Sequence, residues 1–176
     1  MVSNLKRIRS MSYYDDQIKK VQSVVFTGPS NSGKTSLINT YLKQKFRPNY
    51  QNRIPGVEFS SKAISRRNSL NIWDTTGCEK YDTITNYYYR KADVVILVVD
   101  ASDKRSVSSI RHWVSKIKQH TRKNIIIVAN KVDLLKKGNE SYVKEDPNYV
   151  LLSSKNVASV NHLFDKILRT ISFGNE

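Results

Sequence analysis

The sequence predicts an α/β protein with a six-stranded, mostly parallel sheet that carries helices on both faces. Short apolar runs alternate along the chain with stretches whose apolar residues recur every three or four positions, and this alternation indicates a mostly parallel sheet. The runs at 94–99 and 124–129 are rich in valine and isoleucine, as is usual for strands buried on both faces. A glycine-containing loop at 28–35 lies between the first apolar run and a helical stretch, which indicates a strand–loop–helix unit.

The elements are expected in a simple order. Strands are expected at 21–27, 57–64, 69–74, 94–99, 124–129 and 148–152. The second and third flank a polar turn at 65–68, which predicts a hairpin. Helices are expected at 36–43, 110–117 and 160–171, the last two because their apolar residues fall on one face. The polar stretch 134–147 is expected to form a loop with little or no helix. Residues 1–18 are expected to form a flexible basic leader, and residues 19–176 a single domain.

Composition excludes several classes of protein. The chain has 176 residues, enough for one domain with a sizeable core. Its longest apolar run is too short to span a bilayer, and its N-terminal residues lack the apolar segment of a secretory signal. A single cysteine excludes an internal disulfide and indicates the cytoplasm. We therefore expect a cytoplasmic protein, at most peripheral to membranes.

The chain is strongly basic, with a formal net charge of +15. Such a charge favours nucleic acid or an anionic membrane surface as partners. The basic residues are dispersed, however, and no run interleaves them with aromatic residues as in single-strand binders. We favour a solvated basic surface attracted to acidic lipid headgroups over specific nucleic-acid recognition.

The loop from Gly28 to Thr35 matches a phosphate-binding pattern, a glycine separated by four residues from Gly-Lys-Thr. In this setting, backbone amides and the N-terminus of the next helix point toward an anion. Lys34 is expected to reach the β- and γ-phosphates, and the Thr35 hydroxyl to bind Mg²⁺. The expected phosphate-loop contacts to nucleotide are Ser30, Asn31, Ser32, Gly33, Lys34, Thr35 and Ser36.

A second motif, Asn130-Lys131-Val132-Asp133, follows a buried strand and predicts guanine as the base. The two carboxylate oxygens of Asp133 match the N1–H and amino donors of guanine, whereas adenine would leave them unpaired. A site built on such hydrogen bonds rejects the wrong base by a factor on the order of 10⁴. Asn130 and the stem of Lys131 are expected to brace this loop and cover the base.

With these motifs in place, the chain resembles a Ras-superfamily small GTPase and, within that superfamily, a Rab. The resemblance covers residues 21–173. It includes Trp-Asp-Thr-Thr-Gly-Cys-Glu at 73–79, the tyrosine-rich segment 83–93, Gly-Val-Glu-Phe at 56–59 and Ser-Ser-Lys at 153–155. It implies the P-loop NTPase fold of small G proteins, a GTP-binding G domain at 19–176, GTP or GDP with Mg²⁺ as ligands, and a role in vesicle trafficking.

The resemblance also implies roles for single residues. Asp74 is expected to hold Mg²⁺ through a water, and the Gly77 amide to meet the γ-phosphate. Phe46 is expected to pack against guanine. The loop formed by Ser153, Ser154 and Lys155 is expected to contact the base. Phe59, Trp73 and Tyr88 fall where Rabs carry an aromatic effector surface, although ordinary core packing is the alternative for these three residues.

Three departures from the family pattern concern hydrolysis. Cys78 stands where the family has the glutamine that orients the attacking water, and a thiol is a weak donor without an amide. Ile54 stands where a threonine normally closes over Mg²⁺, and Pro55 restricts the backbone beside it. Thr76 replaces an alanine near the γ-phosphate. We expect slow hydrolysis at a defective Cys78 position, with Lys34 as the other catalytic residue.

The expected function is a Rab-like switch that binds an exchange factor, effectors and an activating protein. One alternative is a hydrolysis-deficient scaffold or interaction module. A further alternative is a nucleic-acid-associated GTP-binding protein. The last residues contain no cysteine for prenylation, so no lipid anchor is expected in this chain.

Overall fold

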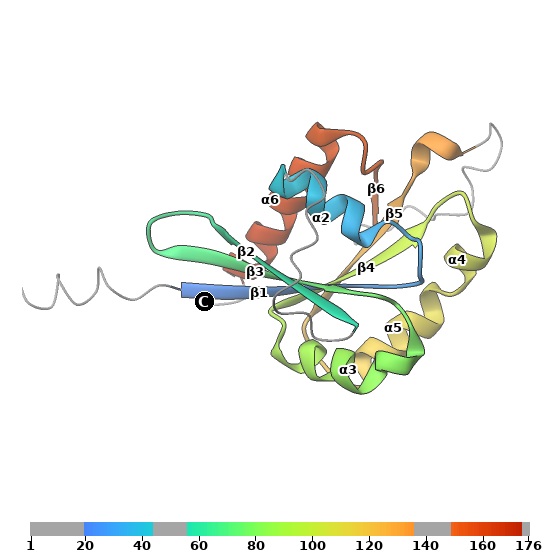
Figure 1. Ribbon diagram of the computed structural model, residues 1–176, viewed down its shortest axis with the longest axis horizontal. Helices are drawn as coiled ribbons and strands as arrows, with labels where there is room; N and C mark the ends of the chain where they lie inside the picture. The colour runs from blue at the N-terminus through green and yellow to red at the C-terminus, as the bar shows by residue number, and fades with distance from the viewer. Residues whose placement is uncertain (1–19, 44–55, 136–148, 174–176) are drawn as a thin grey trace, which may run out of the picture.

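Six strands form one sheet in the order β2-β3-β1-β4-β5-β6 (Figure 1). They are β1 (Lys20–Thr27), β2 (Val57–Ala63), β3 (Asn68–Thr75), β4 (Val94–Asp100), β5 (Asn124–Asn130) and β6 (Tyr149–Leu151). The β2–β3 pair is antiparallel, and all other neighbours are parallel. The expected mostly parallel sheet is confirmed, and each strand bound lies within one residue of its expected position.

This computed structural model describes residues 20–43, 56–135 and 149–173. Several sequence-based expectations therefore lie outside the described residues, namely the leader 1–18, Phe46, Ile54, Pro55 and the loop residues 136–147.

Helices cover the sheet on both faces (Figure 1). The helices α2 (Lys34–Leu42) and α6 (Val157–Phe173) lie on one face, and α3 (Asp82–Lys91), α4 (Lys104–Ser108) and α5 (Ile110–Lys118) on the other. Short 3₁₀ turns occur at η1 (Glu79–Tyr81) and η2 (Val132–Leu134). The sequence did not predict α3, because its buried residues are Thr85, Tyr88 and Tyr89 rather than an aliphatic stripe.

The core consists of two layers, one on each face of the sheet, and successive residues of a strand point into alternate layers. In β1, Val24 and Phe26 pack toward α2 and α6, whereas Val25 packs toward α3 and α5, as the two-residue period of a strand requires. Phe164 of α6 stacks on Phe26 and lies parallel to the Tyr41 ring at 3.5 Å between centroids. These contacts fix the helices and therefore the loops that join them to the carboxyl ends of the strands.

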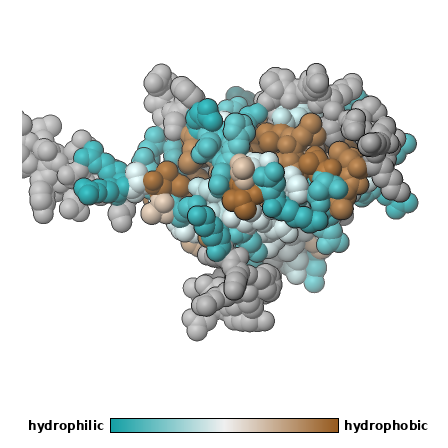
Figure 2. All heavy atoms as spheres, turned by 90° about the horizontal axis from the view of Figure 1, so that it is seen from above, coloured by the Kyte–Doolittle hydropathy of each residue, from teal (hydrophilic) through white to brown (hydrophobic). Residues whose placement is uncertain are grey.

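The opposite end of the sheet carries a projecting hairpin. The turn between β2 and β3 and the start of β1 extend together beyond the other strands (Figure 1). Seen from above, hydrophilic residues gather at this left-hand end, with a few apolar residues beside them (Figure 2). Within the described ranges, no helix is long and apolar enough to cross a bilayer.

Candidate functional site

The loop between β1 and α2 has a backbone that requires glycine at two positions and favours asparagine at a third. Gly33 adopts φ +96°, and a Cβ there would lie 2.2 Å from Nδ2 of Asn130. Gly28 has φ +126°, and its Cβ would lie 2.1 Å from the Val98 carbonyl oxygen. Asn31 adopts φ 63°, a conformation that asparagine tolerates better than most residues. The loop is therefore held tightly against β4 and β5 at the carboxyl edge of the sheet.

Lys34 begins α2 and is buried beneath this loop. Its ammonium donates to the Gly28 carbonyl at 2.9 Å and to the Pro29 carbonyl at 2.8 Å. Burial lowers the pKa of Lys34 to about 8, and the neighbouring Asp74 carboxylate partly opposes that shift. A buried cation beside a helix N-terminus is suited to receive a phosphate.

Asp74 and Thr35 form the neighbouring oxygen cluster. The Thr35 hydroxyl donates to Oδ2 of Asp74 at 2.5 Å. Oδ1 of Asp74 is buried and has no hydrogen-bond partner among the described residues. Burial raises the pKa of Asp74 to about 6, although the Thr35 hydrogen bond and Lys34 act in the other direction. A hydroxyl and an unsatisfied carboxylate oxygen fit a hard divalent cation such as Mg²⁺, which prefers oxygen ligands.

Asn130 joins three loops at the end of β5. Its side-chain amide is fully buried and donates to the Ser32 carbonyl at 2.9 Å, while its Oδ1 accepts from the Ser154 amide at 2.9 Å. The loop 28–33, the loop after β5 and the loop before α6 are therefore linked through one side chain. The Ser32 hydroxyl is also buried and has no partner in the described part of the chain.

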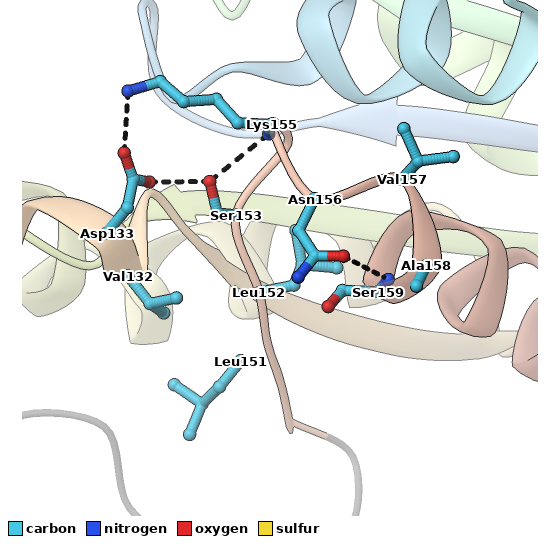
Figure 3. A pocket seen from close by; sticks show the side chains of 10 residues that line it. All are labelled: Val132, Asp133, Leu151, Leu152, Ser153, Lys155, Asn156, Val157, Ala158 and Ser159. Atoms are coloured by element: carbon cyan, nitrogen blue, oxygen red, sulfur yellow. Dashed lines mark hydrogen bonds and ion pairs between the residues drawn. The ribbon is translucent and has the colours of Figure 1, made fainter.

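Asp133 follows in η2 and faces the loop before α6 (Figure 3). Its carboxylate accepts from Oγ of Ser153 at 2.6 Å and from Nζ of Lys155 at 2.8 Å. These hydrogen bonds, the Lys155 one foremost, hold the pKa of Asp133 below its usual range. The carboxylate is therefore ionised at neutral pH and presents acceptors.

Lys131 adopts a left-handed conformation with φ 64°, and its Nζ lies 2.7 Å from Oδ2 of Asp100. The sequence reasoning missed Asp100. It could have been found, because it is the last residue of β4, the strand beside β5, and the carboxyl ends of neighbouring parallel strands meet at one edge. Ser102 also donates to Asp100, so this carboxylate fixes the direction of the Lys131 side chain.

The segment after β3, residues 76–78, packs directly against the loop between β1 and α2. Gly77 has φ +69°, and a Cβ there would lie 2.1 Å from the Gly28 carbonyl oxygen and 3.1 Å from Nζ of Lys34. Oγ of Ser30 donates to the Thr76 carbonyl at 3.2 Å. The Cys78 amide donates to Oγ1 of Thr76 at 3.4 Å, and the Cys78 side chain is exposed.

The expected aromatic residues are in contact. Ring centroids of Phe59 and Trp73 lie 4.6 Å apart, and those of Trp73 and Tyr88 lie 4.4 Å apart. Phe59 is 48% exposed, whereas Tyr88 is 7% exposed. Phe59 is therefore the ring of this cluster that is most open to a partner, Trp73 is half-buried, and Tyr88 is a core residue in the described fold.

The residues predicted to bind nucleotide and Mg²⁺ thus lie at the carboxyl edge of the sheet wherever they are described, whereas Phe59, Trp73 and Tyr88 form a separate cluster. A cavity of about 550 Å³ is lined by Ser30, Asn31, Gly33, Lys34, Thr35, Ser36, Thr75, Thr76 and Lys131. A second cavity, of about 760 Å³, lies beside Asp133, Ser153 and Lys155 (Figure 3).

Comparison with known proteins gives a consistent result. The Ras family profile matches residues 23–173. A probable Rab-related GTPase of Acanthamoeba polyphaga mimivirus is 32% identical over 85% of this chain and 75% of its own length. The Ras-related protein SEC4 of Saccharomyces cerevisiae is 28% identical over 97% of this chain and 84% of its own. The GTP-binding protein ypt2 of Schizosaccharomyces pombe is 36% identical over 70% of this chain and 62% of its own.

GTPases of this family bind GTP and GDP with Mg²⁺, hydrolyse GTP, and interact with exchange factors, effectors and activating proteins. The buried Lys34, the Thr35–Asp74 oxygen cluster and the Asn130–Asp133 loop are of the kind that such ligands need. The chain belongs to the Ras family of small GTPases, among its Rab-related members.

Proposed function

We propose that this protein is a Rab-like guanine-nucleotide switch that hydrolyses GTP slowly and recruits partner proteins at membranes in its GTP-bound state. The observation that carries the proposal is the meeting of three loops at the carboxyl edge of the sheet, joined through Asn130. Ligands of open α/β sheets bind at that edge. Residues 19–176 then form the G domain, and the protein acts in the cytoplasm.

The phosphate end of the site depends on a cation, Lys34, and on a helix N-terminus. The amides of the loop 30–35 and the Lys34 ammonium bind the phosphates, and the γ-phosphate also meets the Gly77 amide. Thr35 holds Mg²⁺ directly and Asp74 holds it through a water. When bound, Mg²⁺ neutralises charge that develops on the β- and γ-phosphate oxygens. The Ser36 hydroxyl, in the first turn of α2, also contacts the bound nucleotide.

The base end selects guanine. Asp133 pairs with the two adjacent donors of guanine, and its depressed pKa keeps it ionised for that purpose. Lys131, oriented by Asp100, covers one face of the base. Asn130 links the loop 28–33 to the loop before α6, and the loop 153–155 contacts the base. Phe46, which lies outside the described residues, is the further base contact that we expect.

Slow hydrolysis follows from the residue at position 78. A water that attacks the γ-phosphate has to be held in line, and a glutamine amide can both donate and accept for that purpose. The exposed Cys78 side chain supplies only a weak donor. Thr76 occupies the cavity wall beside Lys34 and satisfies the Cys78 amide.

The partners follow from the family and from the exposed surface. An exchange factor, effectors and an activating protein are expected, with effectors reading the exposed Phe59 beside Trp73. Because a standard activating protein depends on the water-orienting glutamine, we expect it to accelerate hydrolysis poorly.

The test is a single-turnover hydrolysis assay with Cys78→Gln. We expect the variant to convert bound GTP roughly ten- to a hundredfold faster than the wild type, because positioning of a reactant by about 1 Å accounts for such factors. Cys78→Ser is the matched control, and its rate is expected to equal that of the wild type. An unchanged rate in Cys78→Gln would show that the defect lies elsewhere. No conversion in either protein would favour the hydrolysis-deficient scaffold.

A further inference from the structure

Basic side chains collect at the end of the molecule opposite the nucleotide site. The chain leaves each parallel strand at the carboxyl edge of the sheet and returns through a helix. The C-terminal ends of the helices and the first residues of the parallel strands therefore lie together at the opposite edge, which we call the amino edge. Exposed basic residues occupy these positions: Lys20, Lys43, Arg66, Arg67, Arg90, Lys91, Lys118, Arg122, Lys123 and Arg169.

Acidic residues are distributed in the opposite way. Most of those whose side chains are described lie at the carboxyl ends of strands, at the start of β2, or at the start of the segments that follow the strands: Glu58, Asp74, Asp82, Asp100, Asp103 and Asp133. Two described residues are exceptions. Asp93 is half-buried and accepts from the Ser23 amide at 2.8 Å, and Asp165 lies halfway along α6.

The strand register brings the basic residues together. Val24, Val94 and Asn124 lie side by side in β1, β4 and β5. The pair at 122–123 directly precedes Asn124, and the pair at 90–91 ends α3 three residues before Val94, so both pairs lie toward the same edge of the sheet. The β2–β3 turn at 65–68 and the start of β1 project from the same end, and the Lys20 amide donates to the Arg67 carbonyl at 2.7 Å (Figure 1).

Helix dipoles explain only part of this pattern. Arg90, Lys91 and Lys118 lie in last turns of helices, where a cation stabilises the helix by about 0.3–1 kcal/mol. Arg66, Arg122 and Lys123 lie outside helices, in a turn and directly before β5. Their placement at the same end has no such local cause.

We propose that this amino-edge basic surface docks on an anionic lipid bilayer and holds the nucleotide site facing away from it. The inference rests on the proposed function only for its setting at membranes. Each Lys or Arg near an anionic membrane strengthens partitioning about fivefold. The anionic lipid attracts the basic amino edge and repels the more acidic carboxyl edge, and these two forces fix the orientation of the protein.

The neighbouring apolar residues favour a bilayer over nucleic acid. Val21 is 52% exposed and Ile64 is 36% exposed, and both lie within two residues of the basic turn or of Lys20. Tyr87 is 50% exposed, one turn before Lys91 on α3. Aliphatic side chains gain by entering the acyl boundary, and tyrosine suits the headgroup region, whereas phosphates of a nucleic acid reward neither aliphatic residue.

The test measures sedimentation of the full chain with vesicles of phosphatidylcholine that contain roughly three parts in ten of phosphatidylserine. We expect binding that weakens with salt, that is absent on pure phosphatidylcholine, and that is equal in GDP- and GTP-loaded protein. The variant Arg66→Glu/Arg122→Glu/Lys123→Glu is expected to lose at least about a hundredfold in partitioning, because it removes three attractions and adds three repulsions. Since no nucleotide is consumed, this result is independent of the hydrolysis assay.

The matched control reverses three basic residues at the other end, Lys104→Glu/Arg105→Glu/Arg111→Glu. It changes the net charge equally, and we expect a loss of less than about threefold. Equal losses in the two variants would overturn the proposal, since net charge alone would then explain binding. Tighter retention of a random-sequence RNA than of vesicles, lost in the amino-edge variant, would assign the surface to nucleic acid instead.

Orientation has its own readout, because Cys78 is the single cysteine and is exposed at the nucleotide side. A donor fluorophore on Cys78 is expected to transfer little energy to an acceptor in the headgroup layer. The same donor on Asn68→Cys in a Cys78→Ser background, at the projecting turn, is expected to transfer strongly. Equal transfer from both positions would contradict the orientation.

Discussion

Asp74 shows how one residue can be costly to the fold and useful to the site. Its raised pKa of about 6 means that the protonated form suits the buried position better. Because the folded-state pKa lies above the ordinary value, the stabilising contribution is present at low pH and is lost as pH rises through about 6. At neutral pH the ionised carboxylate, with Oδ1 unsatisfied, therefore destabilises the protein unless a cation pairs with it.

Asp74→Asn is accordingly expected to have opposite effects on two quantities. In nucleotide-free protein with EDTA we expect unfolding free energy to rise by about 1–2 kcal/mol, because the shift of roughly two pKa units is relieved. The increase in Tm on adding Mg²⁺ and GDP is expected to shrink. Differential scanning fluorimetry measures both. Asp103→Asn, at the cap of α4, is the control and is expected to change neither, since asparagine caps equally well. A lower Tm of Asp74→Asn in EDTA would contradict this account.

Asp133 is the residue proposed to select guanine. An asparagine there offers one donor and one acceptor, which suits the carbonyl and N–H of xanthine. We expect Asp133→Asn to lose at least roughly 10² in GDP affinity and to gain affinity for xanthosine diphosphate. Competition binding against a fluorescent nucleotide gives both values. Retained preference for GDP would mean that the base is read elsewhere.

At the scale of elements, the aromatic cluster formed by β2, β3 and α3 contains both a core residue and a surface residue. Tyr88 is buried against Trp73, whereas Phe59, two rings away, is about half exposed. A large residue that is buried contributes to stability mainly through its packing. An exposed ring of the same size contributes little, so it is available to a partner.

This difference gives a stability prediction. We expect Tyr88→Ala to lower the free energy of unfolding by about 2–4 kcal/mol and Phe59→Ala by less than about 1 kcal/mol. Urea denaturation of the nucleotide-bound protein compares the two. Similar losses would indicate that Phe59 is also a packing residue, which would remove the basis for an effector surface at that position.

Elements were predictable where the sequence is apolar. The apolar runs at 94–99 and 124–129 clearly predicted strands, and β4 and β5 begin at the predicted residues and end one residue later. The helix α3 was missed because threonine and tyrosine fill its buried face. The start of α2 was placed two residues late, because Lys34 and Thr35 interact with the loop and with Asp74 rather than with an apolar face.

The site was predictable to a similar degree. Motif residues 28–35 and 130–133 were found because their chemistry depends on spacing along the chain. The Lys131–Asp100 ion pair, the Ser30–Thr76 contact and the unsatisfied oxygen of Asp74 depend on which strands are neighbours and on how tightly loops pack. Such features arise only once the sheet order is known.

At the scale of the whole molecule, the two ends of the sheet have different chemistry. The carboxyl edge holds the loops proposed to bind nucleotide and most of the described acidic residues, and the amino edge holds the basic surface proposed to face a membrane. A switch arranged in this way would keep its nucleotide and its exposed Phe59 accessible to proteins while docked.

The most direct measurement of the central claim is the fate of GTP bound to the wild-type protein. The protein is loaded with GTP and Mg²⁺, freed of excess nucleotide, and its bound GTP and GDP are quantified over several hours. Intrinsic hydrolysis by a small GTPase with the usual glutamine has a half-life of roughly half an hour. We expect steady conversion with a half-life roughly ten to a hundred times longer, the same factor that Cys78→Gln is expected to recover. A half-life of half an hour or less would contradict the assigned defect at Cys78, and GTP that persists without any conversion would contradict a working switch.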